Sequence, residues 1–179
     1  MNRTLKLPLV LATLVASVSV IASPAAAGAP GDGSLAAADV LPFKGSLDGR
    51  HISRTPLEPP FVFDRFEAAG QATHLGQFEL VIEATVNFAA RPVTGTGTYT
   101  FTAASGDRLV ADHTGSSALV RPGLVLISEH AVIDPNRSTG RFSGAEGTFT
   151  VQRLADAATG VGGLTGGTFE GTISLPAGD

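Results

Sequence analysis

Polar side chains on otherwise apolar strand faces are the residues of this sequence best suited to chemistry. His113 shares its strand face with Leu109 and Ala111, and Glu129 lies among apolar residues of a second strand. A hairpin that pairs these strands would bring an imidazole beside a carboxylate inside the protein. Such a pair can transfer protons or hold a polar group of an apolar ligand. A purely structural pair is the alternative, because a buried polar group needs a partner in either case.

The pairing of the two strands decides whether these side chains meet. We expect a hairpin with its loop around residues 117–123, in which His113 lies opposite Glu129. If the second strand has the opposite parity, its other face becomes the core, and His130 points inward in place of Glu129. The sequence leaves the choice between Glu129 and His130 open.

Arg65 is a further candidate for an interior charge, because Phe61, Phe63 and Phe66 flank it. An exposed strand arginine is the alternative. The histidines lack the spacing of a local zinc site, so we expect no metal. The chain also has no nucleophile elbow, phosphate loop or dinucleotide-binding fingerprint, which argues against a conventional hydrolase.

The elements that must position these residues are short β-strands. The clearest is 77–88, where apolar and polar residues alternate along the whole segment. Residues 50–60 contain several prolines and are expected to form a loop. Further strands are expected near 43–47, 61–68, 94–103, 108–115, 124–134, 147–154 and 168–175. Strands at short spacing without a helical period predict an all-β fold, a single antiparallel barrel of about eight strands, with a sandwich as second choice.

The start of the chain has the pattern of a cleaved signal peptide. Early basic residues precede an apolar run, and the small-residue cleavage pattern Ala25–Ala27 follows it. We therefore expect a signal peptide over 1–27, a flexible leader over 28–39 and one barrel domain over 40–179. The mature protein would be secreted or periplasmic and would have no membrane span.

The composition argues against several classes of protein. The formal net charge is −4 and the basic residues are scattered, which disfavours nucleic-acid binding, since phosphate neutralisation needs clustered cations. The absence of cysteine excludes a disulfide framework, thiol catalysis and thiolate metal sites. Such a chain must rely on its hydrophobic core, which a closed sheet provides better than a small open one.

Residues 138–147, Ser-Thr-Gly-Arg-Phe-Ser-Gly-Ala-Glu-Gly, form the most distinctive segment. A run of this type entering a strand resembles the signature of the allene oxide cyclase and dirigent barrels, and of small secreted bacterial proteins related to them. Its glycines can adopt positive φ or lie close to a neighbouring backbone, and Phe142 can pack into the core between them. We therefore interpret the segment first as a folding motif.

The resemblance implies an eight-stranded antiparallel barrel around a cavity for a small, mostly apolar molecule, with no metal or organic cofactor. It also implies an oligomer, often a trimer, with a dimer as the alternative, and guidance of a cyclisation or coupling reaction. No position here matches the catalytic residues of that family, so none is carried over and enzymatic activity stays open. The leading hypothesis is a secreted barrel that binds a small apolar molecule. The alternative is a non-enzymatic structural or interaction module whose barrel is packed solid.

Overall fold

A computed structural model of the protein describes residues 39–176. The signal peptide expected over 1–27 lies outside the described residues, as does the leader over 28–39 except for its last residue. Within residues 39–176, no helix is long and apolar enough to cross a membrane.

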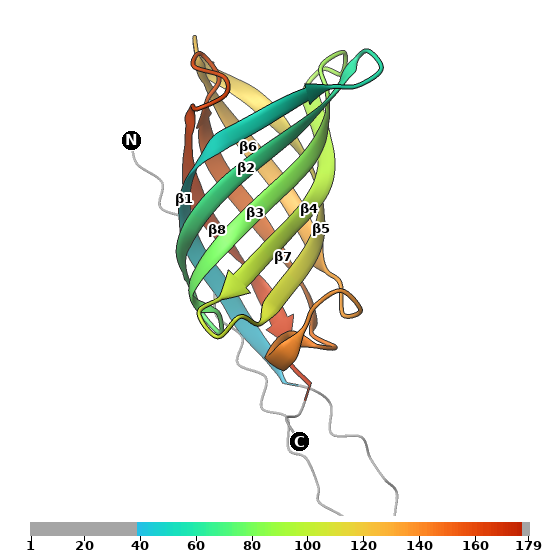
Figure 1. The fold of residues 1–179 in the computed structure, drawn as a ribbon, viewed down its shortest axis with the longest axis vertical. Helices are drawn as coiled ribbons and strands as arrows, with labels where there is room; N and C mark the ends of the chain where they lie inside the picture. The colour runs from blue at the N-terminus through green and yellow to red at the C-terminus, as the bar shows by residue number, and fades with distance from the viewer. Residues whose placement is uncertain (1–38, 177–179) are drawn as a thin grey trace, which may run out of the picture. The chain divides into compact units, whose positions relative to one another are not determined.

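The described residues form eight antiparallel strands in sequence order, and the last strand pairs with the first to close a barrel (Figure 1). This confirms the all-β fold and the single eight-stranded barrel in preference to a sandwich. The strands are β1 (Val40–Pro56), β2 (Phe61–Ala72), β3 (Gly76–Asn87), β4 (Val93–Ala103), β5 (Arg108–Arg121), β6 (Leu124–Ile133), β7 (Glu146–Asp156) and β8 (Leu164–Ser174). A short 3-10 helix, η1 (Gly140–Phe142), lies between β6 and β7.

Two of the expected loops are wrong, because the strands run further than the turn residues indicate. β1 continues through most of the segment 50–60 and ends at Pro56. Proline is tolerated at a strand end, where its missing N–H removes no bond from the middle of a ladder. Similarly, β5 extends to Arg121, so that the hairpin loop expected over 117–123 shrinks to a tight turn before β6.

The register between β5 and β6 differs from the expected one by two residues. His113 lies opposite Ala131, and Glu129 lies opposite Gly115. Side chains alternate between faces with a period of two, so an even shift keeps both residues on the inner face. His113 and Glu129 therefore still meet inside the barrel, although they are offset by two residues along the paired strands.

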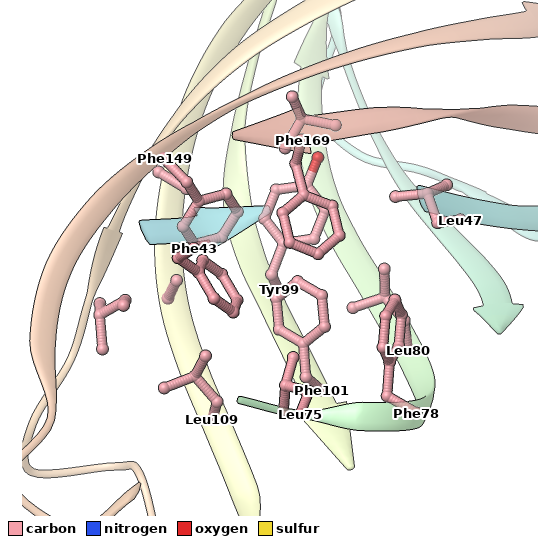
Figure 2. Close-up of a cluster of buried hydrophobic side chains, with 14 of the residues drawn as sticks. Phe43, Leu47, Leu75, Phe78, Leu80, Tyr99, Phe101, Leu109, Phe149 and Phe169 are labelled. Atoms are coloured by element: carbon pink, nitrogen blue, oxygen red, sulfur yellow. The ribbon is translucent and has the colours of Figure 1, made fainter. Parts of the chain in front are cut away.

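The barrel has two different ends. The closed end holds the β2–β3, β4–β5 and β6–β7 connections, and the open end, at the top of Figure 1, holds the other four. The interior towards the closed end is filled by aromatic rings whose centroids lie between 5.1 and 6.3 Å apart (Figure 2). These rings are Phe43, Phe78, Phe101, Phe149 and Phe169. Edge-to-face and tilted pairs are the arrangements that aromatic rings prefer, and here they pack the interior of this half of the barrel.

The distinctive segment 138–147 caps the closed end, which confirms its interpretation as a folding motif. Phe142 is fully buried in the core cluster. Gly140 has φ of 61°, a left-handed conformation that favours glycine. Gly147 approaches β8 so closely that a Cβ there would lie 2.2 Å from the carbonyl oxygen of Thr172. Arg141 donates a hydrogen bond to the carbonyl oxygen of Leu75 and so ties this cap to the β2–β3 turn.

Candidate functional site

A cavity of about 240 Å³ occupies the interior at the open end. Its walls are mostly apolar, and they end on a floor of polar side chains just above the aromatic core. The apolar lining includes Phe66, Ala84, Val86, Val125 and Ile127. The barrel is therefore packed solid in one half and hollow in the other.

The rim of the open end carries exposed large apolar side chains on all four of its connections. They are Leu57 and Phe61, Phe88, Leu119 and Val120, and Val161 and Leu164. Scattered exposed apolar residues are ordinary, but a cluster around one feature is typical of an interaction surface or a ligand entrance.

The floor of the cavity is built on a buried ion pair between β6 and β7. Arg153 Nε lies 3.0 Å from Glu129 Oε2, and Nη2 lies 3.3 Å from Oε1, so the pair is bidentate. The third Arg153 contact is Nη1 to Thr165 Oγ1 at 3.1 Å. Tyr99, from β4, donates its phenolic hydrogen to Glu129 Oε2. Each of these side chains is almost fully buried.

The electrostatics of the floor fix the protonation of its members. Burial opposes the charge of Glu129, but the charge and hydrogen bonds of Arg153 outweigh it and hold the pKa of Glu129 below its ordinary value. Burial and the neighbouring Glu129 carboxylate raise the pKa of Tyr99 well above its ordinary value. The floor at neutral pH is thus an ionised Glu129–Arg153 pair with a neutral phenol beside it.

His113 lies beside this floor. Its Nε2 donates to the carbonyl oxygen of Glu83 at 3.3 Å, which leaves Nδ1 as the ring's acceptor. Nδ1 lies 3.5 Å from Glu129 Oε1 but makes no hydrogen bond within the described residues. Burial lowers the pKa of His113, so the ring is neutral at neutral pH. The structure thus brings the two predicted residues together, with the carboxylate hydrogen-bonded to Tyr99 and Arg153 rather than to His113.

A second polar cluster lines the cavity wall on β1 and β2. Arg54 holds the buried Asp64 carboxylate with two hydrogen bonds of 2.7 Å. His51 Nε2 lies 3.2 Å from Asp64 Oδ1. A register shift between His51 and Ser53 lets residues of both parities reach this cluster, which is the usual effect of a β-bulge.

Two of the predicted site residues lie outside the barrel. Arg65 is partly exposed and pairs with Glu83 and Glu67 on the outer surface. The expectation of an interior charge at this position is wrong because β2 turns Asp64 and Phe66 inward instead. His130 is exposed, since Glu129 and Ala131 occupy the inner positions on either side of it. Of the two residues that the sequence left open, Glu129 faces the interior and His130 does not.

Six residues of the site are not identified from the sequence: Tyr99, Arg153 and Thr165 at the floor, and His51, Arg54 and Asp64 in the wall. Arg153 shares a strand face with Phe149 and Val151, so the same alternation argument that selected His113 would have found it. Tyr99 lies on the apolar face of β4, and alternation alone does not indicate that its hydroxyl meets Glu129. His51 lies in the segment 50–60, where a loop is expected. Asp64 lies in β2, whose phenylalanines do not indicate which face points inward.

The titration of Tyr99 gives a direct test of this floor. Tyr99 is the protein's single tyrosine and there is no tryptophan, so the near-ultraviolet tyrosinate absorbance reports on this one side chain. We expect the native protein to show no tyrosinate at about pH 10, where tyrosine in an unfolded chain is half ionised. Tyrosinate should appear only when alkali unfolds the barrel. A native titration midpoint equal to that of the urea-unfolded chain would contradict the buried Tyr99–Glu129 contact.

The arrangement can hold a ligand and place it against fixed charges, but the described residues contain no group of three His, Asp or Glu side chains suited to a metal ion. Of the carboxylates that line the cavity, Glu129 and Asp64 face arginines, and Asp156 accepts hydrogen bonds from Ala158 and Thr159. His51 in the wall and His113 beside the floor offer ring nitrogens. Comparison with known proteins found no matching family model, no matching curated protein and no matching solved structure.

Proposed function

We propose that this protein is a secreted barrel that binds one small, mostly apolar molecule in the cavity at its open end. The observation that carries the proposal is the half-filled interior, apolar on its walls and polar on its floor. An eight-stranded barrel either is filled by side chains or holds one small ligand. The cavity of about 240 Å³ is slightly smaller than the sites that hold drug-sized ligands, about 300–1,000 Å³, so the ligand is small.

The charges around the cavity favour a neutral ligand. Glu129 is paired with Arg153, and Asp64 is paired with Arg54. A charged ligand would have to break one of these pairs or be buried without a partner, and both cost free energy. A neutral apolar molecule with one polar group avoids this cost.

A purely structural role accounts for only part of the molecule. The packed aromatic core explains why the barrel is stable towards its closed end. It gives no reason for a hollow half that contains buried ion pairs, because filling the space with apolar side chains would stabilise the barrel further. The cavity therefore favours ligand binding over a solidly packed module.

The proposal has three further parts that extend beyond binding. Export rests on the signal-peptide pattern of residues 1–27, and kinship with the allene oxide cyclase and dirigent barrels rests on residues 138–147. Self-association as a dimer or trimer is supported by the exposed Leu119 and Leu164 at the rim. Guided cyclisation or coupling is supported by apolar walls that would exclude water from a reactive molecule, above a fixed carboxylate.

Native mass spectrometry of the protein purified from culture medium without detergent tests binding. We expect a mass above that of the mature chain, which returns to the chain mass after extraction with organic solvent. The same spectra give the oligomeric state and the site of signal-peptide cleavage. A bare chain mass before and after extraction, together with no binding from a panel of small apolar molecules, would contradict the proposal.

A further inference from the structure

His51, in the cavity wall, has one ring nitrogen that is not hydrogen-bonded to the protein within the described residues. His51 Nε2 lies 2.9 Å from the carbonyl oxygen of Ser53 and 3.2 Å from Asp64 Oδ1. Both neighbours are acceptors, so Nε2 carries a hydrogen, and in the tautomer protonated there Nδ1 is an acceptor. Within the described residues Nδ1 makes no hydrogen bond, and His51 lines the cavity.

The His51 ring is held rigidly in this orientation. It stacks on Phe66 with a centroid separation of 4.6 Å and an interplanar angle of 23°. Its backbone N–H donates to Gly163 and its carbonyl oxygen accepts from Gly162, which anchors this part of β1 to the β7–β8 connection. Asp64, which fixes Nε2, is itself held by Arg54. The acceptor is therefore preorganised, with its tautomer set by the neighbours of the other nitrogen.

Most hydrogen-bond donors of the two arginines in the cavity are already engaged by the protein's own side chains. Arg153 uses Nε, Nη1 and Nη2 on Glu129 and Thr165. Arg54 uses Nε and Nη2 on Asp64. Arg54 Nη1 makes no hydrogen bond within the described residues, but each arginine of the cavity is already neutralised by a carboxylate, and His51 Nδ1 offers an acceptor.

We infer that His51 Nδ1 accepts a hydrogen bond from a hydroxyl group, so that the ligand is a small apolar alcohol. The inference rests on the proposed function and adds the class of ligand to it. A hydrocarbon of the same shape would cover Nδ1 without pairing it, which costs the desolvation of a polar atom. A carboxylate would lie near Glu129 and Asp64 with no unpaired guanidinium among the lining residues to neutralise it.

Three probes with the same carbon skeleton separate these classes: cyclohexylmethanol, methylcyclohexane and cyclohexanecarboxylate. Their affinities for the full protein can be measured by NMR titration at pH 8. We expect the alcohol to bind about 5- to 100-fold more tightly than the hydrocarbon, and the carboxylate to bind most weakly. The ¹⁵N resonance of His51 Nδ1 should move when the alcohol binds and stay in place when the hydrocarbon binds.

The variant His51→Phe keeps a ring to stack on Phe66 and removes the acceptor. We expect it to bind the alcohol and the hydrocarbon equally, with the hydrocarbon affinity unchanged. His130→Phe, on the exposed face of β6, is the matched control and should keep the full preference for the alcohol. If His51→Phe does not fold, the Nδ1 resonance of the unmodified protein decides.

The outcomes distinguish this inference from the proposed function beneath it. Equal affinity for alcohol and hydrocarbon in the unmodified protein, or tightest binding of the carboxylate, would overturn the assignment of an alcohol while leaving an apolar binding site in place. An alcohol preference that survives in a folded His51→Phe variant would overturn the role of His51. Failure of all three probes to bind would count against the proposed function itself.

Discussion

Replacing Arg153 with methionine is expected to lower the free energy of unfolding by about 3–5 kcal/mol, measured by urea denaturation at pH 7. Methionine fills much of the same space but leaves the Glu129 carboxylate buried without its counter-charge. Tyr99 remains as a donor to that carboxylate, but a single phenolic hydrogen does not replace a bidentate guanidinium. The loss is large because both partners of the pair are almost fully buried.

Arg65→Met is the matched control, because Arg65 pairs with Glu83 and Glu67 at the barrel surface. Exposed pairs of this type contribute about 0–1 kcal/mol, so this variant should be nearly as stable as the unmodified protein. The double variant Arg153→Met with Glu129→Gln should recover much of the stability, since it removes both buried charges. Equal stability of the Arg153 and Arg65 variants would show that the Glu129–Arg153 pair contributes nothing to the fold.

The loss of unfolding free energy caused by Arg153→Met is expected to become smaller as the pH falls. The pKa of Glu129 is held below its ordinary value in the folded protein, so its pairing stabilises the fold above about pH 4.3, the value for an unfolded chain. That stabilisation is lost as the pH falls through the lowered pKa. The unmodified protein and the Arg153→Met variant should therefore approach each other in stability in acid. A difference in stability that stays constant down to strong acid would mean that Glu129 is not the group left unpaired.

Strand alternation was enough to predict the fold and two residues of the site, His113 and Glu129. β3 reveals its inner face from sequence, because Phe78, Leu80 and Ile82 share one face while Gln77, Glu79 and Glu83 share the other. The same argument placed His113 and Glu129 on inner faces, and an error of two residues in register did no harm to that conclusion. Parity is therefore a robust prediction from a sequence of this kind, whereas register is not, since it depends on how turns and bulges close.

The rest of the site lay in places where local signals are misleading. Prolines after Arg54 made 50–60 look like a loop, although β1 runs to Pro56 and a bulge turns both His51 and Arg54 towards Asp64. In β2, three phenylalanines of mixed parity give no clear inner face. The buried position next to Phe66 belongs to Asp64, and its partner Arg54 lies in the part of β1 that resembles a loop in sequence. A buried charge is predictable only when its counter-charge is known, and that information resides in the strand pairing.

Replacing Gly95 with leucine is expected to abolish ligand binding while leaving the barrel folded. Gly95 lies on β4 and lines the cavity, and a Cβ placed there meets nothing closer than 3.7 Å, at the carbonyl oxygen of Thr85 and at Val86 Cγ2. The leucine side chain would extend into the hollow half of the barrel and occupy the space of the ligand. We expect the affinity for small apolar molecules to fall about 100-fold or more, which corresponds to a steric conflict of about 2.7 kcal/mol.

Gly95 is chosen because a side chain at this position can fill the cavity without disrupting the pairing of β4 with its neighbours. Two residues along β4, a Cβ on Gly97 would lie 1.8 Å from the carbonyl oxygen of Glu83, so a side chain there would disrupt the sheet. Thr96→Leu adds a leucine between the two on the exposed outer face and should bind ligand as before. Circular dichroism and urea unfolding would confirm that both leucine variants fold. If Gly95→Leu still captures the ligand with unchanged affinity, the molecule binds outside the barrel, and the rim around Leu119 and Leu164 becomes the surface to probe.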